Sequence, residues 1–200
     1  MEMEQVMELF HTSEALDGDG RVFLSERGLS IPESQKAGLA SRSGWIHFGY
    51  QRDGKVVRYK SRNLKEKRFL ASAAPENFVY PFFNQVDFKK KDYVIITEGE
   101  FDCLALITLG IENVISLPNG CNSAESTIKQ NYQYLAEFQE IYICFDQDEP
   151  GRKSAAEVQQ FLPPSKYRNV KLPCKDPNEW LLQENPSKED FLQLMRKSER

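Results

Sequence analysis

The second half of the chain alternates short, unbroken apolar runs with segments of helical pattern. The apolar runs are YVIIT, VISL, IYICF and NVKL, and the helical segments between and after them are FDCLALITLG, AESTIKQNYQYLAEF, GRKSAAEVQQFL and NEWLL. Strands without polar alternation are typical of a parallel sheet that helices cover on both faces. We therefore predict an α/β fold with about four mainly parallel strands over residues 91–200, closed by a terminal helix in SKEDFLQLMRKSER whose end frays.

Residues 1–90 differ in pattern and predict a separate, small α+β subdomain. A helical stretch around residues 4–10 and two short helices within FLSERGLSIPESQKAGL precede a hairpin. The hairpin strands are GWIHFGY and KVVRYKSR, joined by a turn at Asp53-Gly54. Because side chains alternate along a strand, Arg58, Lys60 and Arg62 share one face of the hairpin.

Positive charge is concentrated in the hairpin region. Residues 51–70 contain eight Lys and Arg residues but only two acids, Asp53 and Glu66, whereas the whole chain has a formal net charge of -4. Such a run is either a solvated face or a phosphate-binding surface. The row of Arg58, Lys60 and Arg62 likewise is either the wet face of an antiparallel sheet or a set of phosphate contacts.

Composition excludes several classes of protein. The 200 residues, 40% of them hydrophobic, include no run of about 18 apolar residues that could span a membrane. The first residues, MEMEQVMELF, are acidic, whereas a signal peptide begins with basic residues, so we expect a cytoplasmic protein without membrane partners. The four cysteines form no C-x-x-C pair, so we expect reduced, mostly buried thiols and neither a disulfide framework nor a zinc site.

Carboxylates follow two of the predicted strands at the point where each strand ends. YVIIT runs into Glu98-Gly99-Glu100-Phe101-Asp102, and IYICF runs into Asp146-Gln147-Asp148. Ligands of open α/β sheets bind at the carboxyl ends of the strands. Carboxylates brought together there would raise each other's pKa unless a cation that prefers oxygen ligands neutralised them. This arrangement predicts a magnesium site.

Each acid also has a structural explanation. Glu100 and Asp102 fall in the first turn of a helix, where the helix dipole favours acids. Asp148 could be a turn or capping residue. Asp176-Pro177-Asn178-Glu179 is a good helix start, with aspartate at the N-cap, proline at N1 and glutamate at N3, and capping explains it without any chemistry. His11 and His47 have no evident catalytic partner and are interpreted as structural.

Three acidic elements in order carry a family resemblance. E-G-E-F-D, D-x-D-x-x-G-R and K-D-P-N-E each lie at or beyond the end of a predicted strand, and together they resemble the TOPRIM domain of primase-type proteins. The segment RGLS and the basic hairpin resemble the N-terminal subdomain of the RNA polymerase region in phage primase-helicases and their mitochondrial helicase relatives. The resemblance covers residues 24–182. The sequence has no G-x-x-x-x-G-K-[ST] motor motif and no cysteine-rich zinc module.

The resemblance implies roles for individual residues. It implies the metal ligands Glu98, Asp146, Asp148 and Asp176, the first three also as catalytic acids, with Glu100 and Asp102 in supporting roles. Lys60 is implied as a catalytic cation, and the implied nucleotide- or nucleic-acid-binding residues are Arg58, Lys60, Arg62, Lys67 and Arg152. The cofactor implied is Mg²⁺ or Mn²⁺, with two or more ions.

The activity that the resemblance implies is RNA primer synthesis on a single-stranded DNA template from ribonucleoside triphosphates. A replicative helicase or a separate zinc-binding module would be further partners, in a phage or prophage replication system in the bacterial cytoplasm. Two alternatives use the same fold. One is a non-catalytic module that binds single-stranded DNA or loads a helicase, and the other is a TOPRIM nuclease in which water replaces the sugar hydroxyl.

Overall fold

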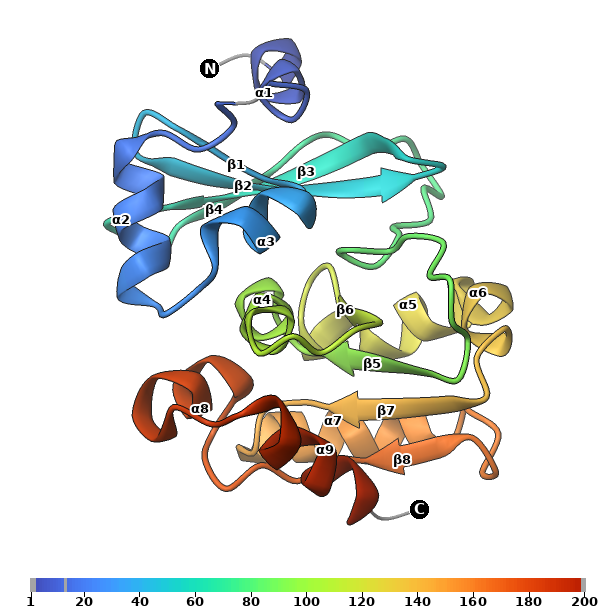
Figure 1. The fold of residues 1–200 in the computed structure, drawn as a ribbon. Coiled ribbons are helices and arrows are strands. Elements are labelled where there is room, and N and C mark those ends of the chain that lie inside the picture. Colours follow the sequence, from blue (N-terminus) through green and yellow to red (C-terminus); the bar gives the residue numbers. More distant parts are fainter. Residues whose placement is uncertain (1–2, 13, 199–200) are drawn as a thin grey trace. The chain divides into compact units, whose positions relative to one another are not determined.

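The computed structural model describes residues 3–12 and 14–198. The chain forms two compact units, Met1–Val86 and Asp87–Arg200 (Figure 1). The N-terminal unit is a small antiparallel sheet with short helices, and the C-terminal unit is a parallel sheet between helices. Within the described residues, no helix has both the length and the apolarity that crossing a membrane requires.

The N-terminal unit contains four antiparallel strands that pair in chain order. The strands are β1 (Leu39–Arg42), β2 (Trp45–Arg52), β3 (Lys55–Asn63) and β4 (Phe69–Ala71), and the helices are α1 (Met3–Leu9), α2 (Gly18–Glu26) and α3 (Ile31–Lys36). The predicted hairpin is confirmed as β2 and β3. Asp53 and Gly54 both have positive φ, 52° and 73°, as the two central residues of a type I′ hairpin turn require.

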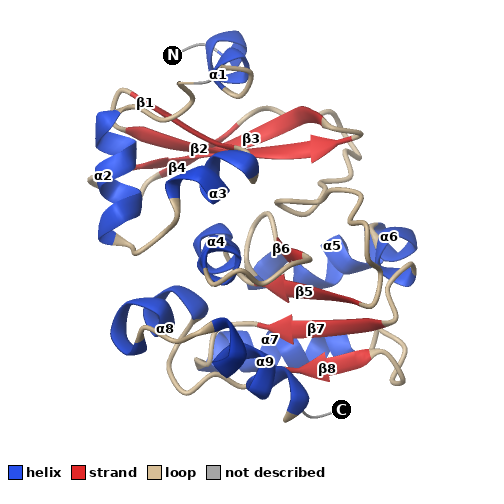
Figure 2. Ribbon diagram, in the orientation of Figure 1, coloured by secondary structure: helices blue, strands red, loops and turns tan. Residues whose placement is uncertain are grey.

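The two faces of this sheet differ in what covers them. Helices α2 and α3 lie on one face, and α1 lies on the other (Figure 2). Ile46, Phe48 and Tyr50 of β2 are almost completely buried, and they alternate with Trp45, His47 and Gly49 on the opposite face. The core of the unit therefore lies on the face of Ile46, Phe48 and Tyr50.

The C-terminal unit has the predicted parallel sheet, with strand order β6-β5-β7-β8. Its strands are β5 (Tyr93–Thr97), β6 (Val114–Ser116), β7 (Glu140–Cys144) and β8 (Tyr167–Asn169), and all three pairings are parallel. Its helices are α4 (Glu100–Thr108), α5 (Ala124–Gln130), α6 (Tyr132–Ala136), α7 (Glu149–Gln159), α8 (Pro177–Glu184) and α9 (Lys188–Arg196), with a 3₁₀ turn at Cys121–Ser123. Figure 2 shows α7 behind the sheet and α9 in front of it. The unbroken apolar runs are buried because helices cover both faces.

Two predicted elements of the C-terminal unit differ from the structure. The fourth strand is Tyr167–Asn169 and shares only Asn169 with the predicted NVKL, because β8 pairs with β7 through Tyr167 and Asn169 while Val170 and Leu172 are buried beyond the strand. The predicted helix AESTIKQNYQYLAEF is broken at Asn131, where the side-chain amide (2.9 Å) and the backbone amide (3.0 Å) both donate to the Thr127 carbonyl.

The terminal helix α9 is better anchored than predicted. Phe191 is fully buried, Met195 is 6% exposed, and Ser187 and Asp190 form a capping box at the start of the helix. Glu199 and Arg200, the end of the predicted helix, lie outside the described residues.

Candidate active site

Strand β5 delivers the first acidic element. Glu98 follows its last residue, Thr97, and Gly99 is the N-cap of α4. A β-carbon at Gly99 would lie 2.8 Å from Oδ2 of Asp102, so the absence of a side chain at Gly99 lets the Asp102 carboxylate fold back toward the strand end. Glu100, in the same first turn, is buried at 6% exposure. Burial and then the charge of Glu100 raise the pKa of the Cys103 thiol well above its ordinary value.

Strand β7, next to β5 in the sheet, delivers the second element. Asp148 is the N-cap of α7, and its Oδ1 accepts a hydrogen bond from the Gly151 amide (3.0 Å). A β-carbon at Gly151 would lie only 2.1 Å from the carbonyl oxygen of Asp146. The glycine of D-x-D-x-x-G therefore allows the first turn of α7 to pack directly against the backbone of Asp146.

The third element joins the first two through α8. Asp176 is the N-cap of α8 and accepts a hydrogen bond from the Glu179 amide (2.7 Å), so the predicted helix start is confirmed. One residue into the helix, the Asn178 amide donates to Oδ1 of Asp102 (3.4 Å). This contact brings the start of α8 to the start of α4, and Asp176 to the carboxyl edge of the sheet.

The ionisation of two of the predicted acids, Asp146 and Asp102, depends on the other carboxylates near them. The pKa of Asp146 is raised to about 6, first by burial and then by the charges of Glu98 and Asp176. The pKa of Asp102 is raised well above its ordinary value by burial and by the charges of Asp176 and Asp146. The structure therefore brings Glu98, Asp102, Asp146 and Asp176 together, with Asp148 beside them. We call these five residues the acidic cluster.

The loop after β6 closes one side of the acidic cluster. Gly120 has φ of 63°, and a β-carbon there would lie 3.5 Å from Oε1 of Glu98. The thiol of the next residue, Cys121, interacts with Glu98 and Ser154, and burial together with Glu98 raises the pKa of this thiol to about 12. The other carboxylate oxygen of Glu98, Oε2, is buried and makes no hydrogen bond within the described part of the chain.

Lys175 is a site residue that the sequence prediction does not include. Its Nζ lies 3.5 Å from Oδ2 of Asp146 and 3.7 Å from Oδ2 of Asp148. The backbone also holds it, since the Gln147 amide donates to the Lys175 carbonyl (2.6 Å) and the Lys175 amide donates to Glu179 (2.8 Å). Its position as the first residue of K-D-P-N-E was the only signal in the sequence.

The acidic cluster fits a divalent cation by its chemistry. All of its donors are carboxylate oxygens, which Mg²⁺ and Mn²⁺ prefer, and the buried Oε2 of Glu98 lacks a partner that a cation would supply. Over residues 3–12 and 14–198, however, no group of three or more acidic, histidine or cysteine side chains is already arranged to hold a metal. The Lys175 ammonium provides the positive charge between Asp146 and Asp148 in this structure.

The predicted row of cations does lie on one face of β3, but that face is not a fully solvated one. Lys60 is directly opposite Phe48, and Arg62 is opposite Ile46, so the row shares the core face of the sheet. The cations are only partly exposed, and each lies over an aromatic ring. The distance to the ring centroid is 4.7 Å from Arg58 Cζ to Phe78, 5.7 Å from Lys60 Nζ to Phe69 and 5.0 Å from Arg62 Cζ to Phe23. Phosphate contact by this row remains a prediction.

Two further predicted cations lie outside these groups. Lys67 is exposed in the loop between β3 and β4. Arg152 is exposed in the first turn of α7, and its guanidinium donates to the Gln147 carbonyl, next to Asp146 and Asp148. Arg152 therefore lies beside the acidic cluster, and Lys67 belongs to the N-terminal unit.

Comparisons with known proteins agree with this architecture. Residues 95–181 match the family model described as Toprim-like, a range that contains the whole acidic cluster. The DNA helicase/primase of enterobacteria phage T3 is 34% identical over 171 residues, which cover 82% of this chain and 30% of the relative. A chloroplastic/mitochondrial Twinkle homolog protein of Arabidopsis thaliana is 30% identical over 162 residues, which cover 70% of this chain and 22% of that protein. The chain thus spans less than a third of these two relatives.

One solved structure matches this chain over most of its own length as well. The primase fragment of the bacteriophage T7 primase-helicase protein superimposes with a TM-score of 0.76 at 32% identity, over 86% of this chain and 73% of that fragment. The fold and the sequence identity agree over 86% of the chain, and the acidic motifs lie within the matched Toprim-like range. The chain therefore belongs to the family of TOPRIM-fold primase catalytic cores.

Proposed function

We propose that this protein is a DNA-directed RNA polymerase of the primase type that synthesises short RNA primers on single-stranded DNA. The observation that carries the proposal is the acidic cluster at the carboxyl edge of the parallel sheet, in a chain of the primase-core family. In the reaction, the 3′-oxygen of one ribonucleotide attacks the α-phosphate of an incoming ribonucleoside triphosphate. The new P–O bond replaces the bond to pyrophosphate, which leaves.

Glu98, Asp146 and Asp148 are the proposed catalytic acids, and with Asp176 they are the proposed ligands of two or more Mg²⁺ or Mn²⁺ ions. Such ions would lower the pKa of the attacking hydroxyl and neutralise the triphosphate. The chain itself orients the carboxylates, because the Asp148 and Asp176 caps hold them at helix starts and Gly151 lets α7 pack against Asp146. Glu100 and Asp102 are proposed to support this geometry from the first turn of α4.

The cations supply contacts to phosphates in the proposal. Lys60 is the proposed catalytic cation, and Arg58, Arg62, Lys67 and Arg152 are proposed to hold the template or the triphosphate. Aromatic rings contact the charged groups of Arg58, Lys60 and Arg62. These contacts limit the rotamers of the long side chains before a phosphate binds.

The proposed partners follow from the length of the relatives. The phage T3 relative is named a helicase/primase, and this chain matches 30% of it. We propose that a replicative helicase and a separate zinc-binding module complete the system, with no zinc site in these 200 residues, in a phage or prophage context in the bacterial cytoplasm.

One observation favours a second candidate, a non-catalytic module that binds single-stranded DNA or loads a helicase. The Lys175 ammonium already balances the charges of Asp146 and Asp148. A module without turnover would retain this ion pair as a structural element.

Primer synthesis separates the two candidates. Purified protein is incubated with mixed-sequence single-stranded DNA, labelled ribonucleotides and Mg²⁺ or Mn²⁺, and the products are resolved on a denaturing gel. We expect short RNA ladders from the wild type and none from Asp146→Ala, whose DNA affinity is retained. A blank gel at high protein concentration with DNA binding intact would favour the binding module, and shortening of an end-labelled template would indicate a nuclease.

A further inference from the structure

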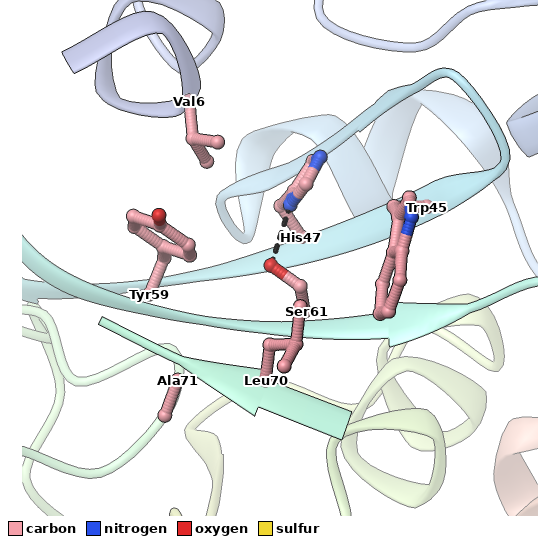
Figure 3. Close-up of a pocket in the computed structure, with 7 residues that line it drawn as sticks. All are labelled: Val6, Trp45, His47, Tyr59, Ser61, Leu70 and Ala71. Carbon is pink, nitrogen blue, oxygen red and sulfur yellow. Dashed lines mark hydrogen bonds between the residues drawn. The ribbon is translucent and has the colours of Figure 1, made fainter. Parts of the chain in front are cut away.

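A pocket of about 260 Å³ lies on the sheet of the N-terminal unit, on the face that carries α1 (Figure 3). Strand β2 contributes Trp45 and His47, and strand β3 contributes Tyr59 and Ser61. Val6 of α1 and Leu70 and Ala71 of β4 complete the wall. The pocket is therefore on the opposite face of the sheet from the row of Arg58, Lys60 and Arg62, and none of the residues with a proposed catalytic role lines it.

His47 is the polar centre of this pocket. The residue is 3% exposed, and Nδ1 of its ring shares a hydrogen bond of 2.7 Å with the Ser61 hydroxyl. The other ring nitrogen, Nε2, is buried and makes no hydrogen bond to any described residue. A buried polar atom without a partner costs about 1–3 kcal/mol, so native proteins rarely keep one without a reason. A ligand that hydrogen-bonds to Nε2 would supply the missing partner.

The protonation state of His47 limits the chemistry of that ligand. Burial lowers the pKa of the imidazole to about 4, so the ring is neutral at physiological pH. With Nδ1 engaged by Ser61, the neutral ring offers one hydrogen-bonding function at Nε2, and the tautomer decides whether it donates or accepts. Among the described residues, none that lines the pocket is charged. The pocket therefore suits a neutral group with a hydrogen-bonding edge.

The walls suit a flat group. The aromatic rings of Tyr59 and Trp45 lie on either side of His47 (Figure 3), and the Tyr59 ring meets the imidazole edge-on with centroids 6.0 Å apart. The volume is just below the range of about 300–1,000 Å³ that is typical for drug-sized ligands. Outside the lining residues, the Arg68 guanidinium lies 5.8 Å from the centroid of the Trp45 ring, so a cation accompanies this aromatic wall.

We propose that this pocket binds a nucleobase, with Trp45 and Tyr59 contacting its faces, His47 Nε2 hydrogen-bonding to its edge and Arg68 holding the adjoining phosphate. Stacking of a base on aromatic side chains contributes about 1–3 kcal/mol and tolerates different bases. The proposal rests on the proposed function only for the source of the base, which is either the single-stranded template or a nucleoside triphosphate. Binding itself requires neither a metal nor turnover.

Equilibrium binding without metal tests the pocket. Fluorescence anisotropy compares a labelled oligothymidylate with an abasic strand of equal length, which keeps every phosphate and removes the bases. We expect Trp45→Leu to weaken binding of the oligothymidylate by about 5- to 150-fold, the equivalent of one stacked base, and to leave the abasic strand unaffected. Tyr132→Leu, which removes an exposed aromatic ring from the C-terminal unit, is the matched control and should change neither.

Two further measurements complete the test. His47→Phe fills the same space without Nε2 and should reduce the preference for bases, whereas His47→Gln, which keeps a hydrogen-bonding group, should retain part of it. Quenching of Trp45 fluorescence by ribonucleoside triphosphates is compared in the wild type and His47→Phe. If the pocket binds the triphosphates but not the oligothymidylate, the source of the base is free nucleotide and not the template. Equal affinities of wild type, Trp45→Leu and His47→Phe for all of these probes would overturn the proposal.

The outcome is independent of the primer assay. If Trp45→Leu abolishes base-dependent binding but the wild type makes no primers, the proposed pocket is supported and the proposed activity is overturned. If the wild type makes primers but neither Trp45→Leu nor His47→Phe changes binding, the proposed activity is supported and the proposed pocket is overturned.

Discussion

At the scale of single residues, Asp176 has two functions that one substitution can separate. Its side chain caps α8 through the Glu179 amide, and its charge contributes to the raised pKa of Asp146. Asparagine caps a helix about as well as aspartate but is a weaker metal ligand. We expect Asp176→Asn to change the free energy of unfolding by less than about 0.5 kcal/mol and to lower primer synthesis, whereas Asp176→Ala should also lose about 1 kcal/mol of stability.

Urea denaturation and the primer assay, run on the same preparations, measure these two effects. Ser187→Ala is a control for capping alone, since Ser187 caps α9 away from the acidic cluster and should lower stability without a specific loss of activity. Full activity in Asp176→Asn would restrict Asp176 to the capping role that its sequence pattern already explains.

His47 gives the stability of the protein a pH dependence of predictable sign. The pKa of the folded imidazole is about 4, below its unfolded value of about 6.5, so between these values only the unfolded state takes up the proton. The contribution of His47 to stability is therefore complete above about pH 6.5 and is lost as the pH falls toward 4. At about pH 5 the loss should be about 2 kcal/mol.

Urea unfolding at about pH 7.5 and about pH 5 checks this prediction when it is compared with His47→Gln, which does not titrate. Asp102 and Asp146, whose raised pKa values act in the opposite direction, cancel in the difference between the two proteins. The same pH dependence in both proteins would show that the imidazole is accessible to water.

At the scale of elements, the contact between α7 and β7 decides where Asp146 lies. Gly151 is buried in the first turn of α7, and a β-carbon there would overlap the Asp146 carbonyl at 2.1 Å. Since both partners are backbone, the overlap can be relieved only by moving the helix. We expect Gly151→Ala to destabilise the protein by about 2 kcal/mol or more and to abolish primer synthesis, although alanine favours a helix more than glycine does.

Lys153→Ala is the matched control, two residues further along the same helix. Lys153 is exposed, and its ion pair with Glu157 is long at 3.9 Å, so its loss should cost less than about 0.5 kcal/mol. Thermal unfolding and the primer assay compare the two variants. A Gly151→Ala protein as stable and as active as Lys153→Ala would show that the helix shifts without moving Asp146.

The elements also show which parts of the structure could be predicted from the sequence. Continuous apolar runs identified β5, β6 and β7 because these strands are buried on both faces, and Asp53-Gly54 identified its hairpin because few sequences adopt two positive φ values. The position of β8 was mispredicted because a buried apolar segment beside a short edge strand has the same pattern as the strand itself.

The site was predictable to the extent that it depends on strand ends. Glu98 and Asp146 follow neighbouring parallel strands, so their proximity follows from topology. Lys175 could not be placed in the same way, because its ion pairs depend on how the loop before α8 packs against the end of β7. The face of Lys60 also required the structure, since alternation along a strand gives a common face but does not say which face carries Ile46 and Phe48 of the core.

At the scale of the whole molecule, the acidic cluster makes the stability of the folded chain depend on cations. Burial and repulsion raise the pKa of Asp146 and Asp102, so their ionised forms cost folding free energy at neutral pH, and Lys175 offsets part of this cost. A divalent cation that binds only the folded state adds stability according to its concentration and affinity, about 1.4 kcal/mol at ten times its dissociation constant.

We therefore expect millimolar Mg²⁺ to raise the unfolding temperature by about 3–6 °C, a rise typical of a chain of this size for that free energy. Asp146→Asn removes one of the repelling charges and should be at least as stable as the wild type without metal, yet show little or no rise with Mg²⁺. Asp92→Asn removes an exposed acid away from the cluster and should keep the full rise. Differential scanning calorimetry with and without Mg²⁺ measures all three proteins. An equal rise in all three would mean that Mg²⁺ acts through general screening of the net negative charge, and that the acidic cluster holds no ion in the absence of substrate.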